Sequence, residues 1–381
     1  MLGIGPHIIL DKSVLEMLSG DEFSLLTQYF RLVVPPVLIE EIVADLELKP
    51  TERRLPELVV KRLADRMHEA VGYEPVDYVQ AVAGNLMGHN IPMFGQVPIG
   101  PRPNAYRTSD GHGFIYDRKP EQDSWERLAI GKFQPADVVR AREWRNEITQ
   151  VDLQKLHRDL GPSAKLVLSP GGSFQDVLLL VDRYMENTDR AGQGDLIKEC
   201  AAFVGLSEDG QNAVLRRWEH LNHPKFRDFA PYAAYVTRLN SAFVIGVSSG
   251  VLTTRATNVI DLQYLYYVPF TMVFTSADRF HDTMWPAAAG RNTFVHGVEL
   301  KADLQERLQR SAAGQESKRS GFHPPRSDGS VITRVFDIYM RAEKPTEGQQ
   351  ESAPRSVDDL DPQIREHLKK AWEEIDKRKG E

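Results

Sequence analysis

Four acidic positions in this sequence fall where structural elements are expected to begin or end. Asp11 follows a short apolar run, Glu40 or Glu41 lies near the start of a predicted helix, Asp261 falls in the first turn of another helix, and Asp278 follows a β-rich run. In an open parallel sheet, the carboxyl ends of the strands and the starts of the following helices lie along one edge, where ligands bind. Acids at these places can therefore converge although they are far apart in the sequence.

Carboxylates brought together in this way need a cation. Two like charges 4 Å apart repel by roughly 4 kcal/mol at an effective dielectric of 20, so an uncompensated cluster would raise its own pKa values or open. Oxygen ligands without a cluster of Cys or His suit a hard dication such as Mg²⁺ or Mn²⁺. Such an ion can lower the pKa of a bound water and orient it for attack, so the chemistry expected of this set is metal-assisted hydrolysis.

The first part of the sequence, which must position Asp11 and Glu40 or Glu41, has the pattern of an α/β fold. The apolar run 7–10 predicts a buried strand, and apolar residues at helical spacing over 14–18 and 23–30 predict two helices, the first capped by Ser13. A second strand is predicted over 31–34 because two prolines follow it, and a helix is predicted behind them over 37–46.

The middle of the sequence is polar and helix-rich. Amphipathic stripes predict helices over 58–71 and 141–160, the second ended by Gly161, and the Gly- and Pro-rich stretch 84–120 predicts an irregular or mobile loop. The α/β pattern then returns with predicted helices over 231–252, 258–267 and 300–308 and strands over 270–275 and 292–297. Polar linkers are predicted over 311–330 and 343–356, and an amphipathic helix over 361–375.

Four motifs that carry the acids resemble the acidic motifs of PIN-domain nucleases, in the same order along the chain. They are His7-Ile-Ile-Leu-Asp11, Val34-Pro-Pro-Val-Leu-Ile-Glu-Glu41-Ile42, Asn258-Val-Ile-Asp261-Leu-Gln-Tyr264-Leu265 and Phe274-Thr-Ser-Ala-Asp278-Arg-Phe280. The resemblance implies an α/β fold with a parallel sheet flanked by helices, whose acids hold divalent metal for phosphodiester hydrolysis, usually of RNA. It covers roughly residues 1–48 and 231–300, and the long block between the second and third motifs departs from it.

Carried over to this sequence, the resemblance assigns Asp11, Glu41, Asp261 and Asp278 as metal ligands in that order. Glu41 is preferred to Glu40 because the family acid commonly stands directly before an aliphatic residue, and the choice between them stays open. Three supporting residues and one further acid complete this set: Ser13, Asn258 and Ser276, and Asp282. The corresponding domain division is a PIN-like core in two parts, 1–49 and 231–310, a helical insertion over 50–230, and polar linkers with a terminal helix over 311–381.

A basic and aromatic mixture within 84–120 offers a site for nucleic acid, since aromatic rings can stack on bases and cationic side chains can hold phosphates. An ordinary loop with anchoring aromatic residues is the alternative. The pair His220 and His223 has one-turn spacing but no third soft ligand, and His281 is a neighbour of Asp278 without an assigned role. The candidates for nucleic-acid binding are Arg102, Tyr106, Arg107, Arg118 and Lys119.

Composition excludes several classes of protein. The chain has 381 residues, of which 41% are hydrophobic and 27% charged, and it holds no run of 18 apolar residues that would span a membrane. Its single cysteine, Cys200, excludes a disulfide framework and a thiolate metal site. The net charge of -7 gives no global basic field, so a nucleic acid must be held by local patches. No leader pattern is visible at the start, which predicts a cytoplasmic protein.

The leading hypothesis is therefore a metal-dependent nuclease, an endoribonuclease that uses Mg²⁺ or Mn²⁺, and the family suggests a setting in toxin action or phage defence. The alternatives are a catalytically inactive PIN-like scaffold or binding protein and a nuclease for single-stranded DNA. The stripe over 364–375 predicts a docking helix, either on its own body or on a protein partner. Oligomeric state, including a homodimer, stays open.

Overall fold

The centre of the fold is a parallel sheet of four short strands in the order β2–β1–β5–β6. The computed structural model describes residues 5–51, 55–69, 73–98, 104–108, 111–115, 126–167, 172–314 and 324–340. The strands are β1 (His7–Leu10), β2 (Arg31–Leu32), β5 (Val273–Ser276) and β6 (Thr293–His296). Because β1 pairs with both β2 and β5, the sheet joins the first residues of the chain to a segment far along it, as the four motifs predict. The prediction of an α/β fold with a parallel sheet is confirmed.

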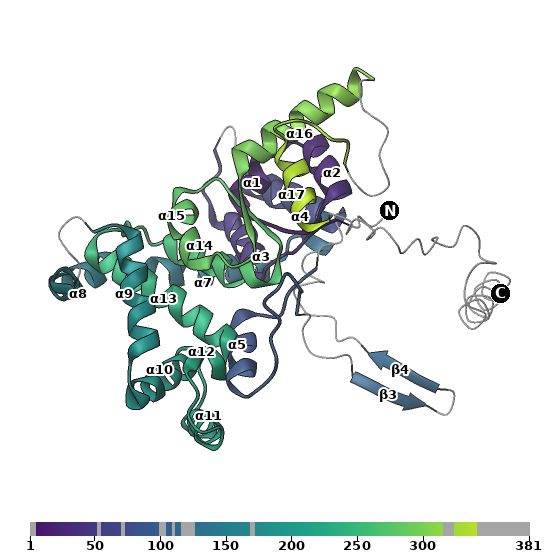
Figure 1. The fold of residues 1–381 in the computed structure, drawn as a ribbon. Helices are drawn as coiled ribbons and strands as arrows, with labels where there is room; N and C mark the ends of the chain where they lie inside the picture. The colour runs from purple at the N-terminus through teal and green to yellow at the C-terminus, as the bar shows by residue number, and fades with distance from the viewer. Residues whose placement is uncertain are drawn as a thin grey trace, which may run out of the picture. The chain divides into compact units, whose positions relative to one another are not determined.

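The two central strands are almost entirely buried because helices cover them. Ile8, Ile9 and Leu10 are buried in β1, and all four residues of β5 are buried. Runs of this kind are typical of parallel strands with both faces covered. Figure 1 shows helices from the beginning and the end of the described chain around these strands, among them α1 (Lys12–Met17), α2 (Gly20–Tyr29), α3 (Pro36–Val43) and α16 (Gly297–Ala312).

Local sequence signals explain where the first helices begin. The side chain of Ser19 and that of Glu22 form a capping box at α2, and Pro36 takes the first position of α3, where its missing N–H costs nothing. The predicted cap of α1 is wrong. Asp11, not Ser13, caps this helix, because the Asp11 carboxylate accepts the Val14 N–H at 2.9 Å.

The region 50–230 is mainly helical, and two details differ from prediction. The helix expected over 141–160 is two helices, because the Asp152 carboxylate accepts the Lys155 N–H at 2.7 Å and starts a new one, in which Gly161 is an interior residue. The stretch 84–120 contains an antiparallel strand pair, β3 (Asn104–Thr108) with β4 (Gly111–Ile115), where an irregular loop was expected. The helices are α4 (Pro56–Glu69), α5 (Tyr78–Leu86), α7 (Pro135–Gln150), α8 (Leu153–Val167), α9 (Phe174–Asn187), α10 (Arg190–Phe203), α11 (Glu208–His220) and α12 (Phe226–Phe229).

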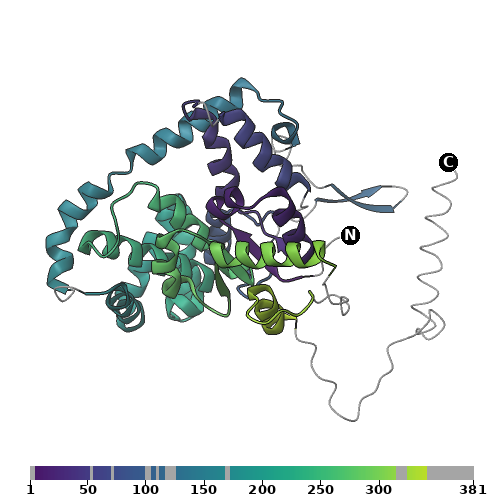
Figure 2. The ribbon, with the colours of Figure 1, turned by 90° about the horizontal axis from the view of Figure 1, so that it is seen from above.

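Helix α13 (Pro231–Ser249) joins the helical region to the sheet. It packs against α5, α8 and α9, and also against α14 (Asn258–Tyr266) and α15 (Arg279–Ala288), which precede and follow β5. Helix α7 packs against α3 and against the short 3-10 helix η1 (Ala44–Glu47), which follows α3. In the view from above, the blue helices α7 and α8 follow one another along one side of this unit (Figure 2). All described residues belong to one compact unit.

The end of the described chain adds structure that the sequence did not predict. A linker was expected over 311–330, and its described residues 324–330 form no helix or strand. They lead into α17 (Val331–Tyr339), which was not predicted, and buried Arg307 of α16 holds them in place. Its guanidinium pairs with Asp303 at 3.0 Å and donates to the Pro325 carbonyl at 2.9 Å. The second predicted linker and the helix predicted over 361–375 lie outside the described residues. No described helix is both long and apolar enough to cross a membrane.

Candidate functional site

Asp11 and Asp278 lie just beyond the carboxyl ends of the two adjacent central strands. Leu10 of β1 is in register with Thr275 of β5, and the Asp11 N–H donates to the Thr275 carbonyl at 3.0 Å, which continues the ladder by one residue. Asp278 comes three residues later and caps α15 by accepting the Phe280 N–H at 2.7 Å. Strand order therefore brings together the first and last of the predicted acids.

Asp11 is buried, and donors surround both of its carboxylate oxygens. Oδ1 accepts from the Ser13 hydroxyl at 2.7 Å and from the Val14 N–H at 2.9 Å, whereas Oδ2 accepts from the Ser276 hydroxyl. Nδ1 of His281 lies 3.6 Å from the same Oδ2. Burial would raise the pKa of Asp11, but the contacts with His281, Ser276 and Val14 outweigh it and lower that pKa. Asp11 is thus held as a carboxylate.

His281 is the main residue of the site that the sequence analysis did not assign. Its ring is fully buried, its Nε2 donates to the Asp261 carbonyl at 2.8 Å, and its Nδ1 lies 2.7 Å from the Ser276 hydroxyl. Burial would lower the pKa of His281, but the charge of Asp11 and the contacts with Asp261 raise it overall. Its spacing of three residues from Asp278 on one helix was the signal that could have found it.

Glu41, and not Glu40, belongs to the acidic group. The Tyr264 hydroxyl of α14 donates to Glu41 Oε2 at 2.7 Å, while Glu40 is held by Arg140 of α7, whose Nε donates to it at 3.0 Å. Burial raises the pKa of Glu41, and the charge of nearby Lys12 partly offsets this effect. Neighbouring positions of α3 therefore face different surroundings, and the structure separates the two candidates that the sequence left open.

Asp261 is the most perturbed acid of the group. Burial, together with the negative charges of Asp278, Glu41 and Asp11, raises its pKa from 3.8 to about 7, although His281 acts in the opposite direction. Among the described residues, no donor bonds to its carboxylate. The four predicted acids are thus close enough to influence one another electrostatically, and the least compensated of them is Asp261.

The acidic cluster, defined as Asp11, Glu41, Asp261 and Asp278, opens to solvent at Asp278. The side chain of Asp278 is 28% exposed, and exposed Arg255 lies 4.0 Å from its Oδ2. Within the described residues, no three His, Cys, Asp or Glu side chains form a group that could hold a metal ion as they stand. The donor chemistry of the cluster suits a hard dication, and binding one would require the carboxylates to draw together.

The remaining predicted site residues differ in whether they contact the acidic cluster. Asp282 is exposed and lies 4.0 Å from His296 rather than in the cluster. The amide of buried Asn258 donates to the Thr253 carbonyl at 2.8 Å, so it secures the start of α14 without touching a cluster acid. Ser13 and Ser276 both contact Asp11. Of the candidates for nucleic-acid binding, Tyr106 and Arg107 belong to β3, and the others, Arg102, Arg118 and Lys119, lie outside the described residues.

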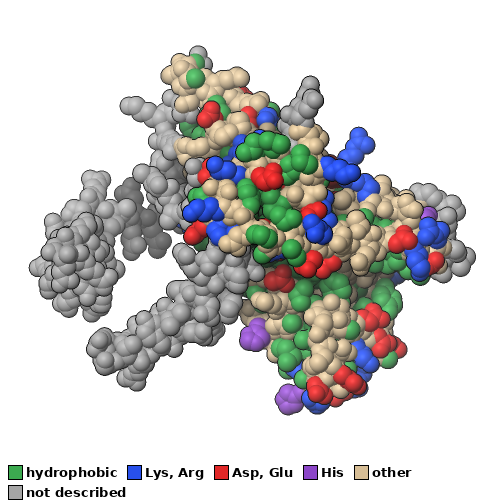
Figure 3. Space-filling model, turned by 180° about the vertical axis from the view of Figure 1, so that it is seen from behind, with side chains coloured by type: hydrophobic (Ala, Val, Ile, Leu, Met, Phe, Trp, Pro, Cys, Tyr) green, Lys and Arg blue, Asp and Glu red, His purple; other side chains and the backbone are tan. Residues whose placement is uncertain are grey.

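Charges on one face of the molecule are mixed. Figure 3 shows Lys and Arg side chains interspersed with Asp and Glu, with hydrophobic side chains gathered between them. The described residues on this face form no continuous basic track along which a phosphate backbone could lie.

Comparisons with known proteins found no counterpart. No protein-family model matches the sequence, and neither the curated proteins nor the solved structures contain a match to it.

Proposed function

We propose that this protein is a metal-dependent nuclease that hydrolyses phosphodiester bonds of RNA at the acidic cluster. The observation that carries the proposal is Asp261, a carboxylate without a described donor, whose pKa is raised to about 7 by burial and by the charges of the other acids. Strongly perturbed carboxyls at the ligand-binding edge of a parallel sheet are more typical of functional sites than of structural ones. The resemblance to PIN-domain nucleases agrees with this assignment.

The divalent ion would be held by Glu41, Asp261 and Asp278. These three acids have acceptor sites that the described residues do not fill, and they offer only oxygen, which suits Mg²⁺ or Mn²⁺. Asp11 was also expected to be a ligand. Three hydrogen bonds and the contact with His281 surround its oxygens, so we assign it to positioning.

The chain's own residues prepare the reaction. Asp11 orients Ser276 and His281, and through the His281 ring it fixes the backbone of Asp261. Arg255, which is 63% exposed beside Asp278, is placed to meet a phosphate at the open side of the cluster. A bound divalent ion would supply a water of lowered pKa and offset the charge of the phosphate.

The test compares cleavage of labelled RNA and single-stranded DNA by the wild type, Asp261→Asn, and Asp195→Asn, with Mn²⁺, Mg²⁺ or chelator. Asp195 lies exposed on α10, so its variant controls for the loss of one charge. We expect RNA cleavage that needs the metal, is unchanged in the control, and falls at least a hundredfold in Asp261→Asn. Cleavage that persists in chelator or in Asp261→Asn would reject the mechanism. Cleavage of DNA but not of RNA would show that the substrate is single-stranded DNA.

A non-catalytic PIN-like scaffold is the second candidate. It is favoured by one observation, the absence among the described residues of three side chains already arranged to hold a metal. Calorimetric titration with Mn²⁺ distinguishes the two functions. A scaffold would neither bind Mn²⁺ at the cluster nor cleave RNA, whereas a nuclease would bind Mn²⁺ and lose this binding when Asp261 is substituted.

A further inference from the structure

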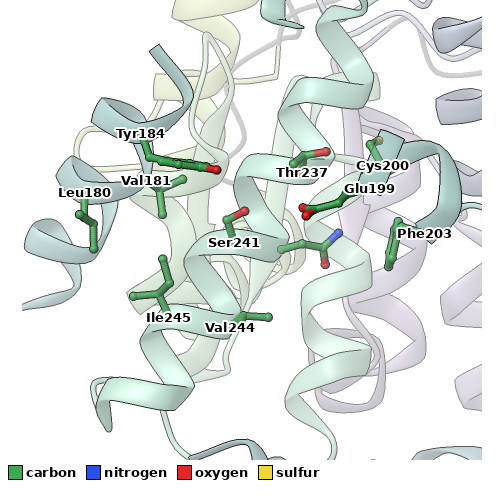
Figure 4. A pocket seen from close by; sticks show the side chains of 11 residues that line it. Leu180, Val181, Tyr184, Glu199, Cys200, Phe203, Thr237, Ser241, Val244 and Ile245 are labelled. Atoms are coloured by element: carbon green, nitrogen blue, oxygen red, sulfur yellow. The ribbon is translucent and has the colours of Figure 1, made fainter. Parts of the chain in front are cut away.

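A groove of about 500 Å³ lies between α9, α10 and α13, in the helical region of the protein. None of its described lining residues belongs to the acidic cluster. Its volume falls in the range of about 300–1,000 Å³ that is usual for sites that bind small molecules. Figure 4 shows the side chains of the three helices converging on this space.

One face of α13 forms the floor of the groove and changes in character along its length. Thr237 and Ser241 give the floor a polar end, and Val244 and Ile245 follow one turn later with an apolar end. Leu180 of α9 also lines the groove. A ligand that fits this floor has an apolar part and a polar part.

Aromatic side chains on both walls remain exposed. Tyr184 of α9 is 56% exposed and Phe203 of α10 is 51% exposed, and Val244 between them is 37% exposed. Apolar side chains of three helices that face one hollow provide contact area that the fold itself does not use. Burial of such surface stabilises a complex by about 25 cal/mol for each Å² removed from water.

Among the described residues that line the groove, Glu199 is the only one with a charged side chain. Its carboxylate and the Tyr184 hydroxyl point into the groove from opposite sides (Figure 4). Within the described part of the chain, neither Glu199 nor the hydroxyl of Ser241 has a hydrogen-bond or ion-pair partner. Cys200 beside them stays a neutral thiol, because burial raises its pKa to about 11.

We propose that this groove binds a small amphiphile with an apolar chain and a cationic head group. The chain of the ligand lies along Leu180, Val244 and Ile245, between the two aromatic rings. Its head lies against the unpaired carboxylate of Glu199, beside the Ser241 hydroxyl. This site is independent of the acidic cluster and does not depend on nuclease activity.

The test is a calorimetric titration of the full-length protein with three probes of equal chain length. Each probe is kept below its solubility limit and, where it forms micelles, below its critical micelle concentration. Decyltrimethylammonium carries a cationic head, decanol a neutral head and decanoate an anionic head. We expect decyltrimethylammonium to bind at least tenfold more tightly than decanoate, with decanol between them. Equal affinity for all three probes, or binding of none, would overturn the proposal.

Three variants locate the binding. Val244→Trp fills the groove from an exposed position, so we expect it to weaken binding of every probe at least tenfold while the melting temperature stays within a few degrees. Glu199→Gln should remove the preference for the cation and leave decanol unchanged. Glu219→Gln, an exposed acid on α11, is the matched control and should behave as the wild type. Unchanged cation binding in Val244→Trp would show that the probe binds elsewhere and would refute the site.

Discussion

Replacing Asp261 by Asn should stabilise the metal-free protein at neutral and alkaline pH. The carboxyl is ionised in the unfolded chain above its ordinary pKa of 3.8, whereas the folded protein raises that pKa to about 7 by burial and by the charges of the other acids. The folded state therefore binds more protons between these two values, and the free energy of unfolding of the wild type falls as pH rises through that window. The neutral amide of Asn removes this loss.

The magnitude follows from the difference between the two pKa values. About three pH units at 1.36 kcal/mol each gives a ceiling of about 4 kcal/mol. Asp261 is only half-buried, and solvent screening reduces this to about 2 kcal/mol. The variant and the wild type should thus be equally stable near pH 4, and the variant should be more stable by about 2 kcal/mol at pH 8.

Urea unfolding at pH 4, 6 and 8 in chelator measures this difference, with Asp195→Asn as the control for an exposed charge. Addition of Mn²⁺ should reverse the order, because a ligand at a hundredfold its Kd stabilises the wild type by about 2.7 kcal/mol and the variant much less. An Asp261→Asn protein that is no more stable than the wild type at pH 8 in chelator would show that burial and the neighbouring acids do not disfavour the Asp261 carboxylate there. The reasoning from the cluster would then be wrong.

Four further substitutions test other parts of the account. His281→Gln should lower the free energy of unfolding at pH 6 by about 3–5 kcal/mol, because it leaves the Asp11 carboxylate buried without its cationic partner. Urea unfolding measures this loss, and a value below about 1 kcal/mol would contradict the ion pair. Asn85→Ala should lower the free energy of unfolding by about 1–3 kcal/mol, since the side-chain Oδ1 of Asn85 accepts two backbone N–H groups at the start of α13, at 2.9 and 3.1 Å. An unchanged thermal melt would argue against this cap. Glu40→Gln should leave Mn²⁺ affinity and cleavage unchanged while Glu41→Gln lowers both, and equal effects would show that α3 presents both acids to the site.

The order of the elements could be predicted because local signals agree with the final fold. Apolar runs gave the positions of β1 and β5, and Pro231 and Gly250, with φ 82°, lie at the two ends of α13 near the predicted limits. Asp11 and Asp278 followed from their places after strands. Such signals depend on neighbours in the sequence, so they need no knowledge of long-range contacts.

The details that escaped prediction depend on such contacts. The break between α7 and α8 comes from a single cap by Asp152 within a continuous amphipathic stripe. Helix α17 depends on Arg307, whose hydrogen bonds reach residues 18–26 positions further along the chain. The role of His281 appears only when β1 and α14 meet around its ring, which brings Asp11 and the Asp261 carbonyl to its two nitrogens.

Contacts also changed how the acids are understood. The separation of Glu41 from Glu40 depends on Arg140, which lies in a different part of the sequence and holds Glu40. The sequence predicted Asp11 as a metal ligand from its motif, without the hydroxyls of Ser13 and Ser276 that occupy its oxygens. The motif predicted where the acids lie, and the packing around them determines which are available.

The central claim is that the acids form one cation site, and diffraction from crystals soaked in Mn²⁺ tests it most directly. The account predicts an anomalous peak within coordination distance of carboxylate oxygens of Glu41, Asp261 and Asp278, with Asp11 still bonded to Ser276. The absence of such a peak at the acidic cluster, with Mn²⁺ bound elsewhere or not at all, would contradict it.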